Sequence, residues 1–370
     1  MTALTRARDA VERRLLTTVL GLPGGIQRRL AGKPVELDGD TLATDLQLML
    51  RLKKAARLPA VETLPIDRAR AATLHEAAQA GGDQPIGEVR DLTAAGLPAR
   101  LYVPTSSTGD SDPLLVFFHG GGFFVGDIDT HDAPCRLIAE RAGVRVLSVE
   151  YHQGPEHPFP AAHDDAERAY HWVVDHAREL GADPERIGVG GDSAGGNLAA
   201  HTAIHAARTG LPCRLQLLVY PLTDARHGAR DGSEEFLSMR LFDEGFFLSR
   251  VFMDRASESY VADDAQMDDP RFSVMLADLP QGLAPAYLCT AGFDPLRDEG
   301  EAYADLLEKA GVTVTRRRFD GLIHSFFNVT GAGRSGPAAV AEIADAVRAG
   351  LHWETSGRAT APGASAAVRG

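Results

Sequence analysis

Short apolar runs alternate with longer amphipathic segments through most of the chain. The predicted strands are residues 99–103, 114–118, 144–149, 186–190, 215–220, 286–290 and 312–319. A continuous apolar run such as 114–118 is typical of a strand that is buried on both faces. Helix-prone segments, including 166–177 and 197–208, lie between the runs. This order predicts an α/β fold with a mostly parallel sheet and helices on both faces.

Three regions break this rhythm. Residues 1–85 combine leucines in a helix-compatible pattern with good helix formers, so we predict that they are helical. Residues 221–285 are too long for an ordinary connection between two strands, and we expect part of them to form a lid. Residues 354–370 are rich in Gly, Ala, Ser and Pro and are predicted to be disordered.

Composition narrows the list of partners. The 370 residues carry a formal net charge of -13, which repels polyanions and makes nucleic acid and anionic membranes poor partners. There is no apolar stretch of the roughly 18 residues that a membrane span needs, and no secretory signal is visible, so a cytoplasmic protein is expected. The cysteines Cys135, Cys213 and Cys289 form no CxxC pair and are expected to be reduced, mostly buried thiols.

The first candidate for chemistry is Ser193, in Gly191-Asp192-Ser193-Ala194-Gly195. The match to G-x-S-x-G is weak alone, but here a predicted strand precedes it and a predicted helix follows it. That context is the sharp turn that exposes a nucleophilic serine above a sheet edge. The alternative is a glycine-rich turn that binds phosphate, although no P-loop lysine follows.

A serine hydroxyl needs a base, and the base needs an acid that fixes its tautomer. His324, just after the last predicted strand, is the candidate base, because His201 and His205 lie on the helix behind the serine and His227 lies in the irregular stretch. Asp294, at the end of the preceding strand, is the candidate acid. Its rivals Asp298 and Glu299 come later, on the following helix.

The glycines of His119-Gly120-Gly121-Gly122 follow a central strand and can present backbone N–H groups to an oxyanion. Gly121 and Gly122 are the candidate donors, with the N–H of Ala194 as the third, and His119 is expected to anchor the loop. Four apolar residues flank these motifs, and we expect them to line the acyl and alcohol pockets, with core packing as the alternative: Phe123, Phe124, Ile323 and Phe326.

Together these motifs resemble the hormone-sensitive-lipase family of esterases, in the bacterial branch with Gly-Asp-Ser-Ala-Gly. The other matching positions are Gly126, Thr130-His131-Asp132, Pro155-Glu156-His157-Pro158-Phe159-Pro160-Ala161-Ala162 and Asp294-Pro295-Leu296-Arg297-Asp298-Glu299-Gly300. The resemblance implies an α/β-hydrolase fold with an eight-stranded sheet and an N-terminal helical cap over the site. It also implies hydrolysis of short- to medium-chain acyl esters without a cofactor or metal, often by homodimers.

The expected organisation is therefore a cap region at 1–85, a catalytic domain at 86–353 with the lid insertion at 221–285, and the tail. One stretch departs from the family, which usually reads Asp-Tyr-Arg-Leu-Ala-Pro-Glu-His-Pro. Glu150 and His152 replace the family's Asp and Arg in a segment expected to brace the oxyanion loop. Two other functions remain open: an amidase or peptidase with the same triad, and a non-catalytic ligand receptor, against which the presence of His324 argues.

Overall fold

A computed structural model describes residues 3–226 and 236–352, with side chains from residue 11 onward. Its centre is an eight-stranded sheet in the order β10-β9-β8-β7-β5-β6-β4-β3. The strands are β3 (Glu88–Ala94), β4 (Leu97–Val103), β5 (Asp112–Phe118), β6 (Arg145–Val149), β7 (Ala182–Asp192), β8 (Gln216–Val219), β9 (Ala286–Phe293) and β10 (Val314–Ile323). Within this sheet β4 pairs antiparallel with β3 and with β6, and the other five pairings are parallel, so the predicted eight-stranded, mostly parallel sheet is confirmed.

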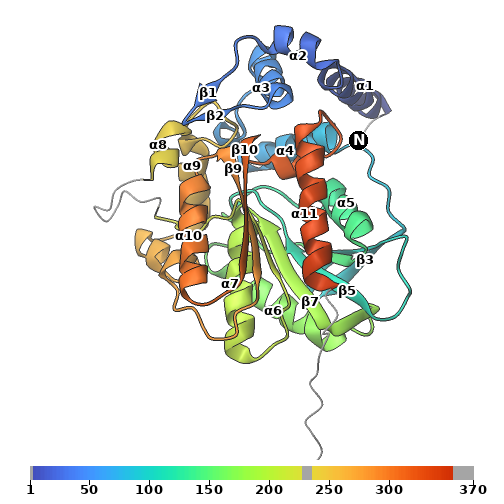
Figure 1. Cartoon of the computed structure of the whole chain (residues 1–370), viewed down its shortest axis with the longest axis vertical. Coiled ribbons are helices and arrows are strands. Elements are labelled where there is room, and N and C mark those ends of the chain that lie inside the picture. Colours follow the sequence, from blue (N-terminus) through green and yellow to red (C-terminus); the bar gives the residue numbers. More distant parts are fainter. Residues whose placement is uncertain (1–2, 227–235, 353–370) are drawn as a thin grey trace, which may run out of the picture.

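Helices cover both faces of the sheet (Figure 1). They are α5 (Asp132–Ala142), α6 (Ala161–His176), α7 (Ala194–Thr209), α10 (Arg297–Lys309) and α11 (Ser335–Leu351). The continuous apolar run of β5 explains the two layers. Leu114, Val116 and Phe118 pack in the core cluster of α6, α7 and α10. The alternate residues Leu115 and Phe117 pack in the cluster of α5 and α11.

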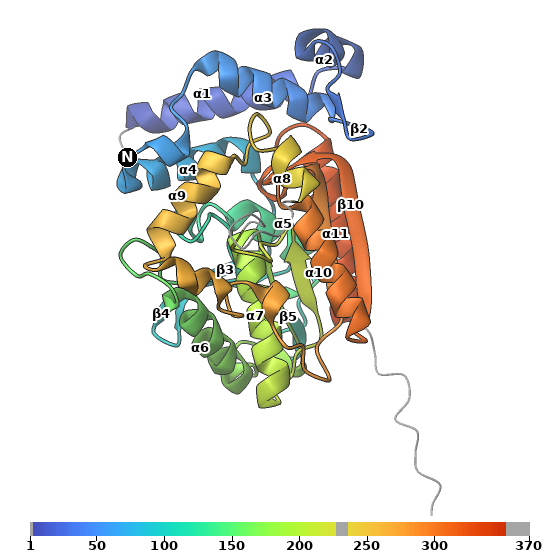
Figure 2. The same ribbon diagram turned by 90° about the vertical axis from the view of Figure 1, so that its left-hand side faces the viewer.

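The N-terminal region is mainly helical, as the sequence predicts. It contains α1 (Ala3–Leu20), α2 (Gly24–Ala31), α3 (Thr44–Ala56), the short η1 (Val61–Thr63) and α4 (Ile66–Gly81). Figure 2 shows α1, α3 and α4 lying across one end of the sheet, next to α9. The region is joined to the sheet where β10 ends, because the N–H of Ala43 donates to the carbonyl of Gly321 at 2.8 Å. It therefore covers the edge at which the parallel strands end.

The predicted lid segment supplies two helices above the same edge, α8 (Leu237–Leu241) and α9 (Arg250–Tyr260). Two short turns follow, η2 (Asp264–Asp268) and η3 (Val274–Leu276). The hydroxyl of Ser249, the N-cap of α9, bonds Glu62 of η1 at 2.8 Å, which ties this segment to the N-terminal region. The predicted tail, residues 354–370, lies outside the described residues, as does His227.

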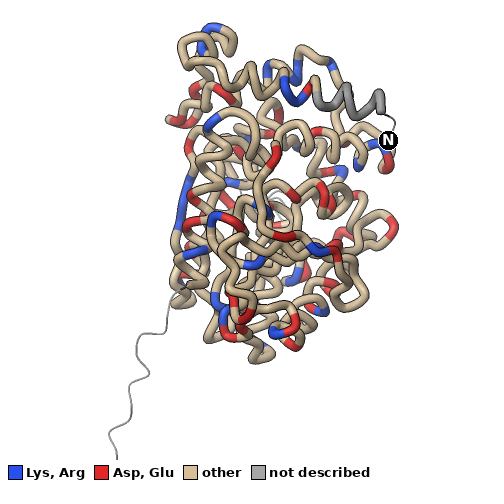
Figure 3. The backbone as a smooth tube through the Cα atoms, turned by 90° about the vertical axis from the view of Figure 1, so that its right-hand side faces the viewer, with Lys and Arg blue, Asp and Glu red and all other residues tan. Residues whose placement is uncertain are grey.

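Two features of the fold depart from the sequence-based expectations. The N-terminal region also contains the two-residue strands β1 (Glu36–Leu37) and β2 (Asp40–Thr41). The edge strand β3 is also absent from the predicted strands, because four of its seven residues are exposed and polar and it lacks an apolar run. The opposite edge strand, β10, carries Arg316, Arg317 and Arg318. Figure 3 shows how Lys and Arg, in blue, are distributed along the backbone. Such charge on an edge strand discourages edge-to-edge association.

The described residues bear on the expectations about membrane spans and about the cysteines. None of the helices there is long and apolar enough to cross a membrane. Cys135, Cys213 and Cys289 are all free, and Cys135 and Cys289 are buried. The core thus holds two of the three thiols without a disulfide.

Candidate active site

Ser193 occupies a strained turn between β7 and α7. Its φ is 55°, a left-handed value that non-glycine residues seldom adopt. The chain can turn this sharply because the residues two positions before and after Ser193 are glycines. A Cβ on Gly195 would lie 2.0 Å from the carbonyl oxygen of Phe118, and one on Gly191 would lie 2.2 Å from the carbonyl oxygen of Gly195. The predicted strand–turn–helix setting of the motif is therefore what the structure contains.

Three predicted residues from distant parts of the chain meet at this turn. His324 Nε2 lies 2.9 Å from Ser193 Oγ, and His324 Nδ1 lies 2.7 Å from Asp294 Oδ2. Asp294 is fully buried, and its other oxygen accepts the N–H of Leu296 at 2.9 Å. The carboxylate is thus fixed by two hydrogen bonds, one of which orients the imidazole.

The rival residues are engaged elsewhere. His201, on α7, bonds Glu167 at 2.8 Å, and Glu167 also pairs with His205. Asp298 forms an ion pair with Arg297 at 2.7 Å on α10. Glu299 is buried and accepts the N–H of Thr223. Neither of these two carboxylates is a hydrogen-bond partner of His324 among the described contacts.

The glycine loop after β5 has an unusual backbone. Gly121, Gly122 and Phe123 have consecutive positive φ values of 121°, 60° and 61°. At Gly121 a Cβ would lie 2.0 Å from the carbonyl oxygen of Val125, so only glycine fits. Gly122 and Ala194 line the same cavity as Ser193. The loop thus brings candidate N–H donors to the serine.

His119 contacts the backbone of this loop. Its Nδ1 lies 2.8 Å from the carbonyl oxygen of Gly120, and its ring stacks on Tyr151 at 4.3 Å between centroids. Burial, and then the nearby His131, lower the pKa of His119 to about 4. The ring is therefore neutral near pH 7, in keeping with the anchoring role expected from the sequence.

Asp192 is a second anchor of the loop, which the sequence analysis did not predict. The buried Asp192 accepts the N–H of Gly120 at 2.8 Å and pairs with His131 Nε2 at 3.0 Å. Burial would raise the pKa of Asp192, but His131 and the N–H of Gly120 outweigh it and lower the pKa. The signal was present, because Asp192 and His131 both lie in the motifs that carry the family resemblance.

The segment that departs from the family pattern lies against the loop at several points. The N–H of Ile128 donates to Glu150 Oε2 at 2.9 Å, and Gln153 donates to the carbonyl of Gly126 at 2.9 Å. The N–H of Gly154 donates to the carbonyl of Phe123 at 2.8 Å. His152 turns away from the loop and bonds Asp165 at 2.7 Å. We call residues 150–158 the brace segment.

Glu150 gives the brace a pH dependence. Burial first, then the charges of Asp127 and Asp129, raise its pKa from 4.5 to about 7, against the lowering effects of the Ile128 N–H and His131. A raised pKa favours the protonated carboxyl in the folded state. The contribution of the protonated Glu150 carboxyl to the stability of the folded state is therefore fully present below about pH 4.5. It is lost as the pH rises through about 7.

We expect Glu150→Gln to remove this loss, because glutamine keeps the acceptor for Ile128 without a charge. The variant should be more stable than the wild type at pH 8 by about 1–3 kcal/mol, with little difference at pH 4.5. Urea unfolding at both pH values measures this. Glu185→Gln, at an exposed position, is the control. An equal loss of stability with pH in wild type and Glu150→Gln would contradict the assignment.

A narrow cavity of about 40 Å³ opens beside Ser193. It is lined by Gly122, Phe123, Ser193, Ala194, Leu222, Leu248, Phe252, Met253, Ala256, Ser257, Phe272 and Leu296. Of the four residues expected to form pockets, Phe123 lines it. Phe124 is fully buried and packs against Phe252.

Ile323 and Phe326 lie in the core cluster of α5 and α11, which is the packing alternative considered for them. The sequence could not separate these positions because all four are apolar and adjacent to the motifs. What it missed is the wall of the cavity supplied by α9, which has no motif of its own.

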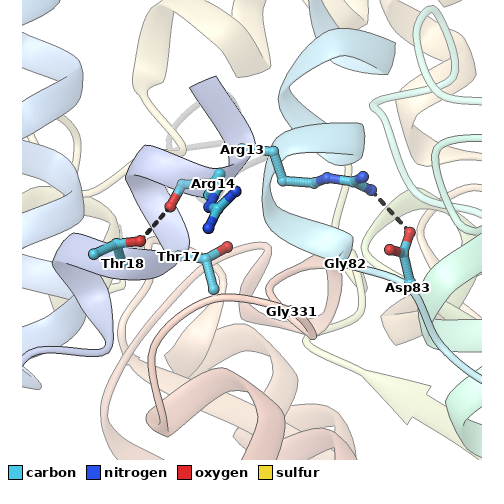
Figure 4. Close-up of a pocket in the computed structure, with 7 residues that line it drawn as sticks. All are labelled: Arg13, Arg14, Thr17, Thr18, Gly82, Asp83 and Gly331. Carbon is cyan, nitrogen blue, oxygen red and sulfur yellow. Dashed lines mark hydrogen bonds and ion pairs between the residues drawn. The ribbon is translucent and has the colours of Figure 1, made fainter. Parts of the chain in front are cut away.

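A wider cavity of about 410 Å³ lies on the N-terminal region (Figure 4). Arg13, Arg14, Thr17 and Thr18 of α1 line it, with Gly82, Asp83 and Gly331 opposite. Arg13 pairs with Asp83 at 2.9 Å across it. None of the predicted site residues lines this cavity. Although it is the larger of the two, it is therefore not the candidate active site.

Comparisons with known proteins agree with this geometry. Residues 115–328 match the family model described as the alpha/beta hydrolase fold. The carboxylic ester hydrolase LipN of Mycobacterium tuberculosis is 44% identical over 87% of this chain and 86% of its own length. The ethyl acetate hydrolase of Pseudomonas putida is 36% identical over 78% of this chain and 91% of its own.

Solved structures give the same result. An ester hydrolase from the metagenome of Lake Arreo, in complex with a derivative of bipyridine phosphonate, superposes with a TM-score of 0.78. It is 39% identical and covers 83% of this chain and 98% of its own. The esterase of Pyrobaculum calidifontis has a TM-score of 0.75 at 36% identity, over 81% of this chain and 97% of its own.

Proposed function

Because the chain belongs to the α/β-hydrolase fold family, among the carboxylesterases of its hormone-sensitive-lipase branch, we propose that it hydrolyses short- to medium-chain acyl esters through an acyl-enzyme on Ser193. The observation that carries the proposal is the unbroken chain of hydrogen bonds from Asp294 through His324 to Ser193, at 2.7 and 2.9 Å. This order of groups activates a hydroxyl that is otherwise a poor nucleophile near pH 7.

The proposed reaction has two halves. Ser193 Oγ attacks the ester carbonyl while His324 Nε2 takes its proton, and Asp294 stabilises the imidazolium through Nδ1–H. The N–H groups of Gly121, Gly122 and Ala194 hold the oxyanion. His324 then returns the proton to the leaving alcohol. Water next attacks the acyl-enzyme by the same route and releases the acid.

The cavity supports the short end of this chain-length range. Its volume of about 40 Å³ leaves little room beyond a short apolar chain, and its walls are mainly apolar. A relative was solved with a phosphonate derivative bound, so we choose a phosphonate as the probe for this serine. We propose that Phe123, Phe252 and Met253 limit the length of the group that enters.

A panel of aryl esters with increasing acyl length, run with matching anilides and with phosphonate-treated enzyme, tests the function. We expect the highest kcat/KM for short and medium acyl groups, much slower anilide turnover, and loss of both after phosphonate treatment. Absence of ester turnover would contradict the proposal. Anilide rates that equal or exceed ester rates would assign the triad to an amidase instead.

We expect Met253→Ala to favour longer acyl groups, because Met253 lines the cavity and is only 5% exposed. The ratio of kcat/KM for a long ester to that for an acetate should rise about tenfold. This is the order of discrimination in kcat/KM that one or two methylene groups provide in an apolar pocket. Val251→Ala, on the same helix but 58% exposed, is the matched control. An unchanged chain-length profile in Met253→Ala would remove this residue from the pocket.

A further inference from the structure

We propose that Arg70, on helix α4 of the N-terminal region, is a positioning residue for the oxyanion loop, defined as residues 119–126. The inference rests on the proposed function, since it assigns Arg70 to the same catalytic site. None of the motifs in the sequence marks this arginine. The structure places its guanidinium where the oxyanion loop and the brace segment meet.

The guanidinium connects two backbone carbonyls from different parts of the chain. Arg70 Nε donates to the carbonyl of Phe124 at 3.0 Å, and Nη2 donates to the carbonyl of Gly154 at 3.0 Å. The N–H of Gly154 in turn donates to the carbonyl of Phe123 at 2.8 Å. One side chain therefore closes a ring of hydrogen bonds directly after the candidate donor Gly122.

Glu156 sets the orientation of the Arg70 guanidinium. Its two carboxylate oxygens accept from Arg70 Nη1 at 2.9 Å and Nη2 at 2.8 Å. The Arg70 side chain is 32% exposed and that of Glu156 is 50% exposed, so solvent screens the ion pair and weakens it. The pair matters mainly because two parallel bonds fix the plane of the guanidinium. Its remaining donors then point at the carbonyls.

The loop needs such support. Gly121, Gly122 and Phe123 all have positive φ, and such conformations cost of the order of 1–3 kcal/mol for a non-glycine residue and persist only where the surroundings hold them. Oxyanion donors act only when they are held at the position where charge develops. A small displacement of the Gly122 N–H would therefore reduce stabilisation of the transition state more than it reduces binding of the ester.

The backbone of α4 is close enough for this role. Ala69, adjacent to Arg70, is fully buried and packs in one cluster with Phe124 and Val125. Helix α4 is thus fixed against the outer side of the oxyanion loop. We infer that the N-terminal region covers the site and also takes part in forming the oxyanion hole.

The test compares Arg70→Ala with the wild type on one aryl ester. We expect kcat per titrated active site to fall about 10–100-fold, with KM changed less than about twofold, since a donor misplaced by about 1 Å can cost this much. Affinity for a trifluoromethyl ketone, whose adduct with serine is tetrahedral, should fall in the same proportion as kcat. Phosphonate titration of Ser193 counts the folded sites.

Three further variants sharpen the result. Arg70→Lys should restore part of kcat, because an ammonium reaches one carbonyl but cannot reproduce the planar fork. Glu156→Gln should lower kcat less than Arg70→Ala does, because both carbonyls keep their donors. Arg68→Ala, an exposed arginine on the same helix, is the matched control and should be indistinguishable from the wild type. Where Arg70→Ala does not fold, Arg70→Lys carries the comparison of kcat with KM.

A KM effect with an unchanged kcat, or lower thermal stability with wild-type turnover per titrated site, would overturn the role of Arg70. Gly121→Ala separates this failure from failure of the proposed function. If Gly121→Ala loses activity while both Arg70 variants keep it, only the inference on Arg70 fails. If all of them keep wild-type kcat, the proposed oxyanion hole itself fails.

Discussion

Ser193→Ala is expected to lower ester turnover by about 10⁴–10⁶-fold while leaving the fold intact. The loss is large because no other group at the turn can accept the acyl chain, and His324 then has no hydroxyl to deprotonate. The fold should survive because alanine keeps the backbone of the turn and removes one oxygen atom. Steady-state kinetics on an aryl ester, together with thermal unfolding, measures both parts.

Ser106→Ala provides the control for this result, since Ser106 is an exposed serine in the loop after β4. It should retain wild-type turnover. Retention of most esterase activity in Ser193→Ala, after contaminating esterases are excluded by phosphonate treatment, would reject Ser193 as the nucleophile.

Gly121→Ala has the second largest expected effect, a loss in kcat of at least about 10²–10³-fold, which is the cost of one missing oxyanion donor. The new Cβ would lie 2.0 Å from the carbonyl oxygen of Val125, at a φ of 121° that L residues rarely adopt. The loop must therefore move, and its N–H groups move with it. Binding of the substrate should change far less than kcat.

Gly210→Ala is a matched control for backbone strain. Gly210 also has a positive φ, 75°, but a Cβ there would meet nothing within 4 Å. This variant should lose about 1 kcal/mol of stability and no activity. If Gly121→Ala had a wild-type kcat, the oxyanion hole would have to lie elsewhere; if Gly210→Ala lost as much activity, the effect at Gly121 would be one of stability.

The three residues proposed to be catalytic were predictable because each lies at the end of a strand with a clear signal. β5, β7 and β9 are continuously buried at their carboxyl ends and read as apolar runs, so Ser193 and Asp294 could be placed at one edge of the sheet. His324 follows β10 in the same way. The chemistry of the three side chains then determines their order.

The missed features depend on contacts between distant segments. β3 is an edge strand whose exposed face is polar, so its sequence resembles a loop. Arg70 reaches Gly154 across 84 residues, and no local pattern marks such a contact. Ile323 and Phe326 are as apolar as Phe123, and only the packing of the chain decides which of them faces the cavity.

In the proposed mechanism, His324 activates Ser193 for covalent attack. Reaction with an aryl phosphonate, followed by peptide mapping by mass spectrometry, tests it most directly. We expect one adduct per chain, on Ser193, and a labelling rate lower by at least about 10³-fold in His324→Ala. An adduct on a different residue, or equally fast labelling of Ser193 without His324, would contradict the proposed mechanism.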